Sequence, residues 1–190
     1  MTTFMISPSF SSTFHTHPAL APNYLFRQTN SDIESQMTPL ILDRESLYIT
    51  LNRLENDVDL FHWGIYLWKG LAKSDGIGKY FHVTDRNCPD KFLYEETRSP
   101  DIRRAINVLV ALKIAIVKPA QWDRLGELLS QVHIHELTTC RTWVLEALKA
   151  LDKEGIVKLK DGGVENIERE CLKYARIRGK IIQQSDYCKF

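Results

Sequence analysis

Apolar residues follow two patterns along the chain, with short β-branched and aromatic runs in the first half and helical spacing in the second. Runs of the first kind predict strands at residues 47–51, 61–68, 79–84 and 91–95. The run at 61–68 is apolar on both faces, which predicts a central strand. The short segments between the runs, including a polar turn at 52–59, favour an antiparallel meander. Residues 105–117 fit either a strand or a buried helix, and their β-branched residues favour a strand that Pro119 ends.

The second half of the chain carries helical spacing. Residues 120–131 and 164–183 are predicted helices, the second of them rich in Lys, Arg and Glu. The clearest helix covers residues 140–154, because one of the two threonines before it can cap it and Gly155 can end it. Strands followed by helices predict an α+β domain, in which a small antiparallel sheet packs against helices.

A chain of 190 residues is long enough for one substantial core, so a single domain is expected. Residues 1–45 are rich in Ser, Thr and Pro and show little periodicity, which predicts a disordered N-terminal tail. The α+β domain is expected over residues 46–183, with a short C-terminal tail at 184–190.

Charge and composition exclude some classes of partner. The 25 basic and 24 acidic side chains leave a net charge of +1, so no overall field draws the protein to nucleic acid. No run of about 18 apolar residues is present, so no transmembrane segment is expected. The cysteines form no CxxC pair, and the N-terminus lacks the layout of a secretory signal, so free thiols in the cytoplasm are expected.

Cys140 is the strongest candidate for chemistry. It stands at the first turn of the clearest predicted helix, where unpaired backbone N–H groups and the helix dipole stabilise a thiolate. We therefore expect its pKa to fall from about 8.5 to between about 3.5 and 7.5. Its spacing to Trp143, Val144 and Ala147 places it on the apolar stripe, so its sulfur should face the sheet.

Two histidines lie where a base for this thiol is needed. His62 is inside the second predicted strand and His82 inside the third, so in a hairpin both rings can share one face opposite the helix start. A nucleophile, a base and an orienting group form the arrangement used in thiol catalysis. The alternative is structural, since a buried cysteine is often a small core residue and a strand histidine is often only hydrogen-bonded.

A resemblance to a known superfamily rests on three segments: Phe61-His62-Trp63-Gly64-Ile65-Tyr66-Leu67, Tyr80-Phe81-His82-Val83 and Thr139-Cys140-Arg141-Thr142-Trp143-Val144. They resemble the circularly permuted papain-like (NlpC-type) superfamily, which includes lecithin:retinol acyltransferase and the phospholipase/acyltransferases related to it. The resemblance implies a permuted papain-like fold with His62 as general base, His82 as third polar group and Cys140 as nucleophile. Over most of residues 46–180 the chain also resembles a fungal family of uncharacterised function that has an HW…YHV…CR-W pattern.

The chain departs from these acyltransferases around the cysteine, where Thr139 and Arg141 replace an Asn before it and acidic or His residues after it. The gap between His62 and His82 is also longer than in the acyltransferase hairpin. We expect a cysteine-dependent hydrolase or acyltransferase that acts on an amide, ester or thioester bond of a small molecule or peptide. The alternative is a non-catalytic binding or accessory protein on the same scaffold, such as one in a fungal biosynthetic pathway.

The remaining candidates predict no further site. His133 and His135 have a spacing that suits metal ligands, but no Cys or carboxylate at a matching interval completes a site, so no metal is expected. Gly76 and Gly78 fit no phosphate-binding loop, and no cofactor is expected. The basic residues of the last predicted helix are interleaved with glutamates, which is typical of a solvated face.

Overall fold

The computed structural model describes residues 41–54, 57–70, 78–86, 88, 91–99, 102–105, 107–176 and 181–184. The predicted N-terminal tail as far as residue 40, and residues 185–190 of the predicted C-terminal tail, lie outside the described residues. Residues 41–45 are described. There Leu42 is buried against an apolar cluster of the domain, and the Asp43 backbone N–H donates to the Tyr48 hydroxyl at 2.8 Å.

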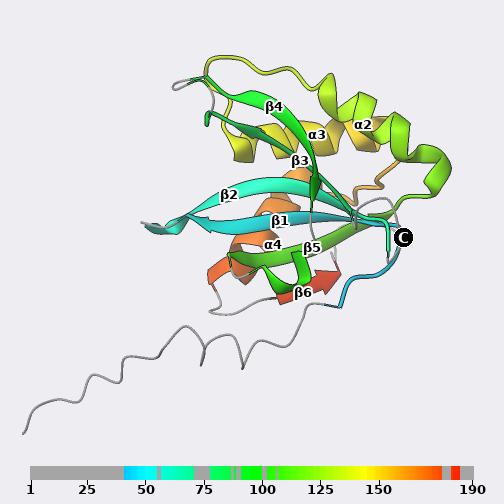
Figure 1. The fold of residues 1–190 in the computed structure, drawn as a ribbon, viewed down its shortest axis with the longest axis horizontal. Coiled ribbons are helices and arrows are strands. Elements are labelled where there is room, and N and C mark those ends of the chain that lie inside the picture. The colour runs from blue at the N-terminus through cyan, green and yellow to red at the C-terminus, as the bar shows by residue number, and fades with distance from the viewer. Residues whose placement is uncertain are drawn as a thin grey trace, which may run out of the picture. The chain divides into compact units, whose positions relative to one another are not determined.

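The described strands form one six-stranded sheet in the order β4-β3-β2-β1-β5-β6 (Figure 1). Its strands are β1 (Ser46–Leu54), β2 (Asp57–Trp68), β3 (Gly78–Thr84), β4 (Leu93–Ser99), β5 (Val108–Ile116) and β6 (Ile181–Gln184). Neighbouring strands are antiparallel except β5 and β6, which are parallel. The meander predicted for the first four strands is confirmed, and the ambiguous segment at 105–117 supplies strand β5.

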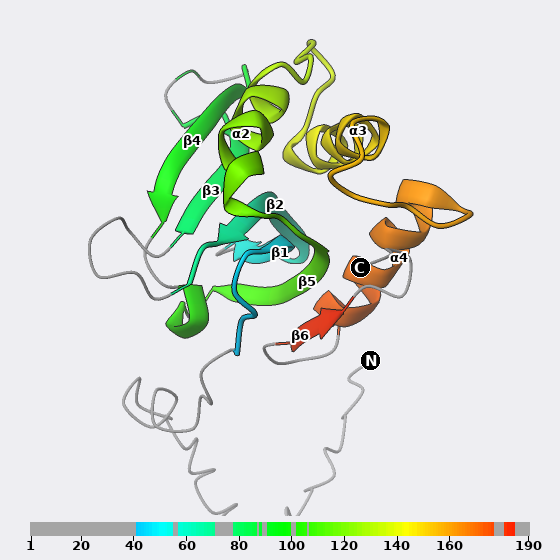
Figure 2. The same cartoon turned by 90° about the vertical axis from the view of Figure 1, so that its right-hand side faces the viewer.

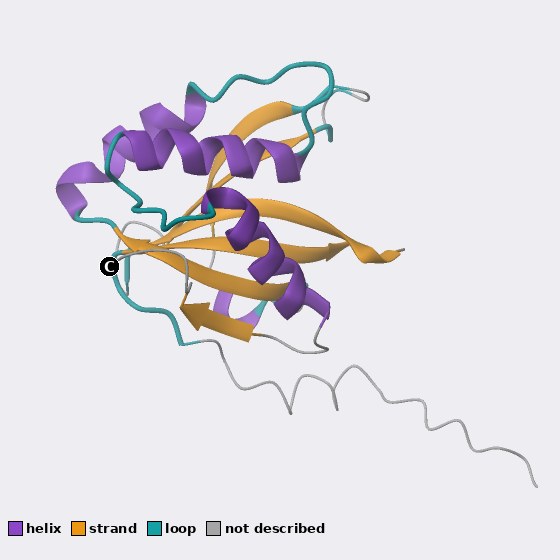
Figure 3. Ribbon diagram, turned by 180° about the vertical axis from the view of Figure 1, so that it is seen from behind, coloured by secondary structure: helices purple, strands orange, loops and turns teal. Residues whose placement is uncertain are grey.

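Three helices lie on one face of the sheet: α2 (Trp122–Ser130), α3 (Cys140–Lys153) and α4 (Gly163–Arg176) (Figure 3). Helix α3 contacts β2 and β3, and α4 contacts β5 and β1. Two short 3-10 helices, η1 (Ile102–Arg104) and η2 (Pro119–Gln121), flank β5 in the sequence. The predicted α+β class, with a sheet packed against helices, is confirmed.

Three sequence-based boundaries are wrong. The strand predicted over 91–95 is β4, Leu93–Ser99, which continues past residue 95 because it pairs with β3 along its whole length. The helix predicted over 164–183 ends at Arg176, and residues 181–184 form β6 instead, because Ile181 and Ile182 pair with β5. The polar segment at 52–59 is not all turn, since β1 continues to Leu54 and β2 begins at Asp57. Polar residues are tolerated there because this end of the hairpin is exposed.

Each face of the sheet carries its own apolar cluster. Phe61, Trp63 and Ile65 of β2 are buried with α3 and α4, whereas Tyr66 and Trp68 are buried on the opposite face with residues of η1. Figure 2 shows η1, the short green coil, and the helices α3 and α4 on opposite sides of the strands. Alternation along β2 therefore directs successive side chains to two different environments, and this decides where its histidine lies. None of the described helices is long and apolar enough to cross a membrane.

Candidate cysteine–histidine site

Helix α3 begins at Cys140 because Thr139 caps it. The Thr139 hydroxyl accepts the Thr142 backbone N–H at 3.2 Å, and the Thr142 hydroxyl accepts the Thr139 backbone N–H at 2.8 Å. This reciprocal pair is a capping box, which confirms the predicted helix start. At the other end Gly155 has a φ of 75°, a left-handed conformation that suits glycine and ends the helix as predicted.

The Cys140 sulfur lies against the backbone of β2. The regular ladder between β2 and β3 ends at the pair Ile65–Phe81, so the two strands are not paired in register beyond it. There the Trp63 backbone N–H donates to Cys140 Sγ at 3.5 Å, and the thiol donates to the Phe61 carbonyl at 3.8 Å. The thiol therefore satisfies two backbone groups of β2 at the point where the ladder to β3 has ended.

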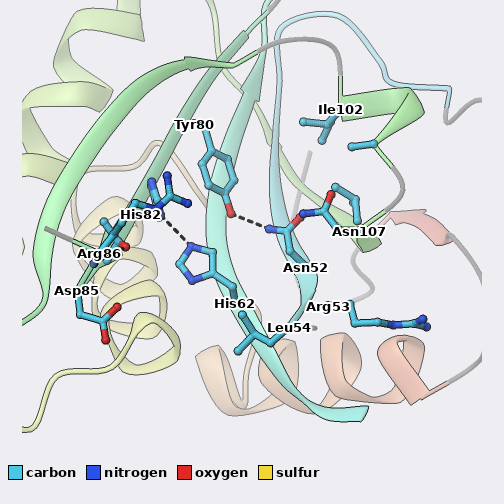
Figure 4. A pocket seen from close by; sticks show the side chains of 13 residues that line it. Asn52, Arg53, Leu54, His62, Tyr80, His82, Asp85, Arg86, Ile102 and Asn107 are labelled. Atoms are coloured by element: carbon cyan, nitrogen blue, oxygen red, sulfur yellow. Dashed lines mark hydrogen bonds between the residues drawn. The ribbon is translucent and has the colours of Figure 1, made fainter. Parts of the chain in front are cut away.

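Two imidazoles meet on the other face of the sheet. His62 Nε2 lies 2.8 Å from His82 Nδ1, and the rings stand edge to face with centroids 5.0 Å apart. Figure 4 shows the two rings pointing toward one another from neighbouring strands. Because Phe61 and Trp63 point toward the helices, His62 between them points away from the helices. The structure thus brings together the two histidines that the sequence placed on one face.

Cys140 approaches this pair from the helix side. It packs against the apolar cluster beneath the helices, and its sulfur touches the backbone on both sides of His62. Within the described part of the chain, no hydrogen bond joins the sulfur to either imidazole. A nucleophile–base contact between Cys140 and His62 therefore requires the Cys140 side chain to turn away from the β2 backbone.

The imidazole pair lines a pocket of about 490 Å³ on the face away from the helices. The Tyr80 hydroxyl accepts a hydrogen bond from Asn52 Nδ2 at 2.8 Å, and the Tyr80 ring lies 4.8 Å from the His82 ring, centroid to centroid. Asp85 and Arg86, which follow β3, and Arg53 of β1 place one negative and two positive charges in the lining (Figure 4). The remaining lining is partly apolar, so the pocket suits a small molecule or an extended peptide segment.

Burial keeps all three candidate side chains neutral near pH 7. Burial, followed by the charges of His82 and Arg86, lowers the pKa of His62 to about 4. Burial and then Arg86 also lower the pKa of His82. The pKa of Cys140 is raised, because burial outweighs the backbone N–H groups of Trp63, Arg141 and Cys140 itself, which act to lower it. The predicted lowering of the Cys140 pKa is therefore wrong. The helix start does stabilise the thiolate, but burial destabilises it more.

Sequence reasoning missed three residues of the site: Glu95, Tyr80 and Arg86. Glu95 lies directly across from His82 in the β3–β4 ladder, and its carboxylate is 3.5 Å from His82 Nε2. Tyr80 lies two residues before His82 on the same face of β3. Because side chains alternate along β3, the sequence alone could have placed Tyr80 on the face of His82. The contact between Glu95 and His82 could not be found in this way, because it depends on the pairing register between β3 and β4.

The other candidates lie away from this pair. His133 and His135 are exposed, with ring centroids 6.1 Å apart. Among the described residues, no three His, Cys, Asp or Glu side chains are grouped so as to hold a metal ion. Arg141 of α3 pairs with Glu168 of α4 beside a groove that is also lined by Arg169 and Lys173 of α4.

The fold and the site define an α+β protein with two paired imidazoles on neighbouring strands and a helix-start cysteine whose sulfur lies against the β2 backbone on both sides of His62. The chain belongs to the DUF6914 family, a family of unknown function, whose model matches residues 44–181. This match spans the sheet from before β1 to the start of β6, and it includes Cys140, His62 and His82. Comparison with the curated proteins gave no significant match, and neither did comparison with the solved structures.

Proposed function

We propose that this protein is a cysteine-dependent hydrolase or acyltransferase that acts on an amide, ester or thioester bond of a small molecule or peptide. The observation that carries the proposal is the 2.8 Å contact between His62 Nε2 and His82 Nδ1 beside the helix start that holds Cys140. The order histidine, histidine, cysteine and the motifs around them support a permuted papain-like arrangement. The cysteine spacing, which contains no CxxC pair, favours a reducing compartment, and we propose that the protein acts in the cytoplasm.

The chemistry starts from a neutral thiol and a neutral imidazole, because the pKa of Cys140 is raised and that of His62 is lowered. The Cys140 side chain turns from the β2 backbone toward His62. Its sulfur forms a bond to the substrate carbonyl carbon while the thiol proton passes to His62 Nδ1, the ring nitrogen that does not contact His82. The backbone N–H groups of Cys140 and Arg141, which already act on the sulfur, are placed to stabilise the oxyanion.

The second half of the reaction reverses these proton transfers. The imidazolium gives its proton to the leaving group as the carbonyl carbon–heteroatom bond breaks, which leaves a thioester on Cys140. Water or an acceptor alcohol or amine then attacks the carbonyl carbon of this thioester, with His62 again taking the proton. The C–S bond to Cys140 breaks, and the imidazolium returns this proton to the leaving thiolate, which restores the starting thiol. His82 holds the His62 ring through their contact during both halves.

A second function is favoured by one observation. The Cys140 thiol is already hydrogen-bonded to the Trp63 and Phe61 backbone, and its pKa is raised. An inert thiol that completes the edge of β2 would have the same contacts. In this alternative the protein binds a ligand in the pocket beside His62 and His82 without reacting with it.

Hydrolysis of an activated ester separates the two functions. The full chain should release p-nitrophenolate from p-nitrophenyl acetate catalytically, and Cys140→Ser should reduce the rate to that of buffer because the thiol is the nucleophile. Cys88→Ser is the matched control, since it removes another free thiol and should leave the rate unchanged. Equal rates for the wild-type protein and Cys140→Ser, with a thioester substrate tested alongside, would establish the binding alternative.

A further inference from the structure

The second ring nitrogen of His82 faces a carboxylate. Glu95 on β4 is the direct cross-strand partner of His82 on β3, so both side chains lie on the same face of the sheet. Glu95 Oε2 is 3.5 Å from His82 Nε2, and the His82 side chain is only 12% exposed. Three side chains from three neighbouring strands therefore form a row, in the order Glu95, His82 and His62.

The chemistry of the outer group decides where the protons lie in this row. A carboxylate only accepts hydrogen bonds, so at 3.5 Å it favours the His82 tautomer that presents Nε2–H to it. The opposite tautomer would direct a nitrogen lone pair at an anion. A neutral His82 with its proton on Nε2 has only a lone pair on Nδ1, and at 2.8 Å this lone pair requires an N–H from His62 Nε2. The proton of His62 is then on Nε2, and its Nδ1 is unprotonated.

We propose that Glu95 is a positioning residue that fixes the proton of His82 on Nε2 and, through His82, that of His62 on Nε2. The proposed function needs a free base at His62 Nδ1, and Glu95 supplies this arrangement without touching substrate. The placement of the protons holds whether or not Cys140 reacts, and only its catalytic meaning rests on the proposed function.

Neighbouring charges do not replace Glu95 in this role. Arg86 lowers the pKa of both imidazoles, and Asp85 raises that of His62, so these groups affect how much of each ring is protonated. Among the described residues, the Glu95 carboxylate contacts His82 Nε2 at 3.5 Å, and only a contact of this kind selects between two neutral tautomers.

Ring nitrogen NMR on the full chain tests the proposal directly. Long-range ¹H–¹⁵N spectra of the ¹⁵N-labelled protein at pH 7.5 distinguish a protonated ring nitrogen from an unprotonated one. The wild-type protein should show His62 and His82 each as a single Nε2–H tautomer. In Glu95→Gln the side chain keeps its shape but can either donate or accept, so both rings should become mixtures of the two tautomers. Glu96→Gln, which removes a carboxylate from the next position of β4, should leave both rings as in the wild-type protein.

The results that would overturn the role of Glu95 differ from those that would overturn the proposed function. A wild-type His62 protonated on Nδ1 would overturn the proposal, as would a His62 tautomer that Glu95→Gln does not change. A change of equal size in Glu96→Gln would also overturn it, because the effect would then belong to β4 in general. Ester hydrolysis by the same samples reports the proposed function separately. If the tautomers shift as expected but the protein does not hydrolyse the ester, the role of Glu95 in placing the protons stands and the proposed enzyme function is rejected.

Discussion

Replacing His62 with Ala should lower the rate constant for acylation of Cys140 by about 10²–10⁴-fold, because it removes the general base. The loss is expected to be in this range because the Cys140 pKa is raised, which leaves little thiolate to react without a base. Ester hydrolysis measured at several substrate concentrations should show the effect in kcat/KM. His133→Ala is the matched control, since this ring is exposed and pairs with His135 rather than with His62 or His82, and it should react as the wild-type protein does.

The pH dependence gives the same prediction a second readout. His62 acts as a base only when neutral, and its pKa is lowered to about 4, so kcat/KM should fall as the pH drops through about 4 and not near 6.5. Arg86→Ala removes a cation that disfavours the imidazolium, so it should move this acid limb to higher pH. An acid limb near pH 6.5, or a His62→Ala protein with full activity, would exclude His62 as the base.

Gly64→Ala should lower the free energy of unfolding by about 1–3 kcal/mol, because a Cβ at this position would overlap the hydroxyl and ring of Tyr80. The Tyr80 ring has little freedom to move away. Its hydroxyl is held by Asn52 at 2.8 Å and lies 3.3 Å from the Thr50 hydroxyl, and its ring packs against His82. Urea unfolding of both proteins measures the difference.

A double-mutant cycle shows whether the clash with Tyr80 is the cause. In a Tyr80→Ala background, Gly64→Ala should cost much less, which would give a coupling between the two sites of about 0.5–3 kcal/mol. Gly126→Ala is the control, since its Cβ would meet only the end of the Glu96 side chain and a helix favours Ala over Gly by up to about 1 kcal/mol. Full additivity of the two substitutions would show that Gly64 is needed for another reason.

Strands β1 and β2 were predictable because both of their faces are buried. β1 and β2 carry β-branched and aromatic residues at successive positions, and their two faces pack in different apolar clusters. Helix α3 was predictable from local signals, namely the threonine cap and Gly155. β6 was not, because residues 181–184 become a strand only through parallel pairing with β5, which lies far away in the sequence.

The site was only partly predictable for a related reason. Alternation along β2 and β3 was enough to place His62 and His82 on one face. The contact of Glu95 with His82 depends on the register between β3 and β4, which local sequence does not contain. The Cys140 pKa had the opposite direction from the prediction because the helix start is visible in the sequence, whereas the burial of its thiol is a property of the packing.

Whether Cys140 is the nucleophile is tested most directly by the site of covalent attachment after brief reaction with p-nitrophenyl acetate. The full chain is quenched in acid within the first turnover, digested and mapped by mass spectrometry. We expect one acetyl group per chain, on Cys140, with the yield sharply reduced in His62→Ala and unchanged in Cys88→Ser. Acetylation spread over surface lysines, with an unmodified Cys140, would contradict this expectation.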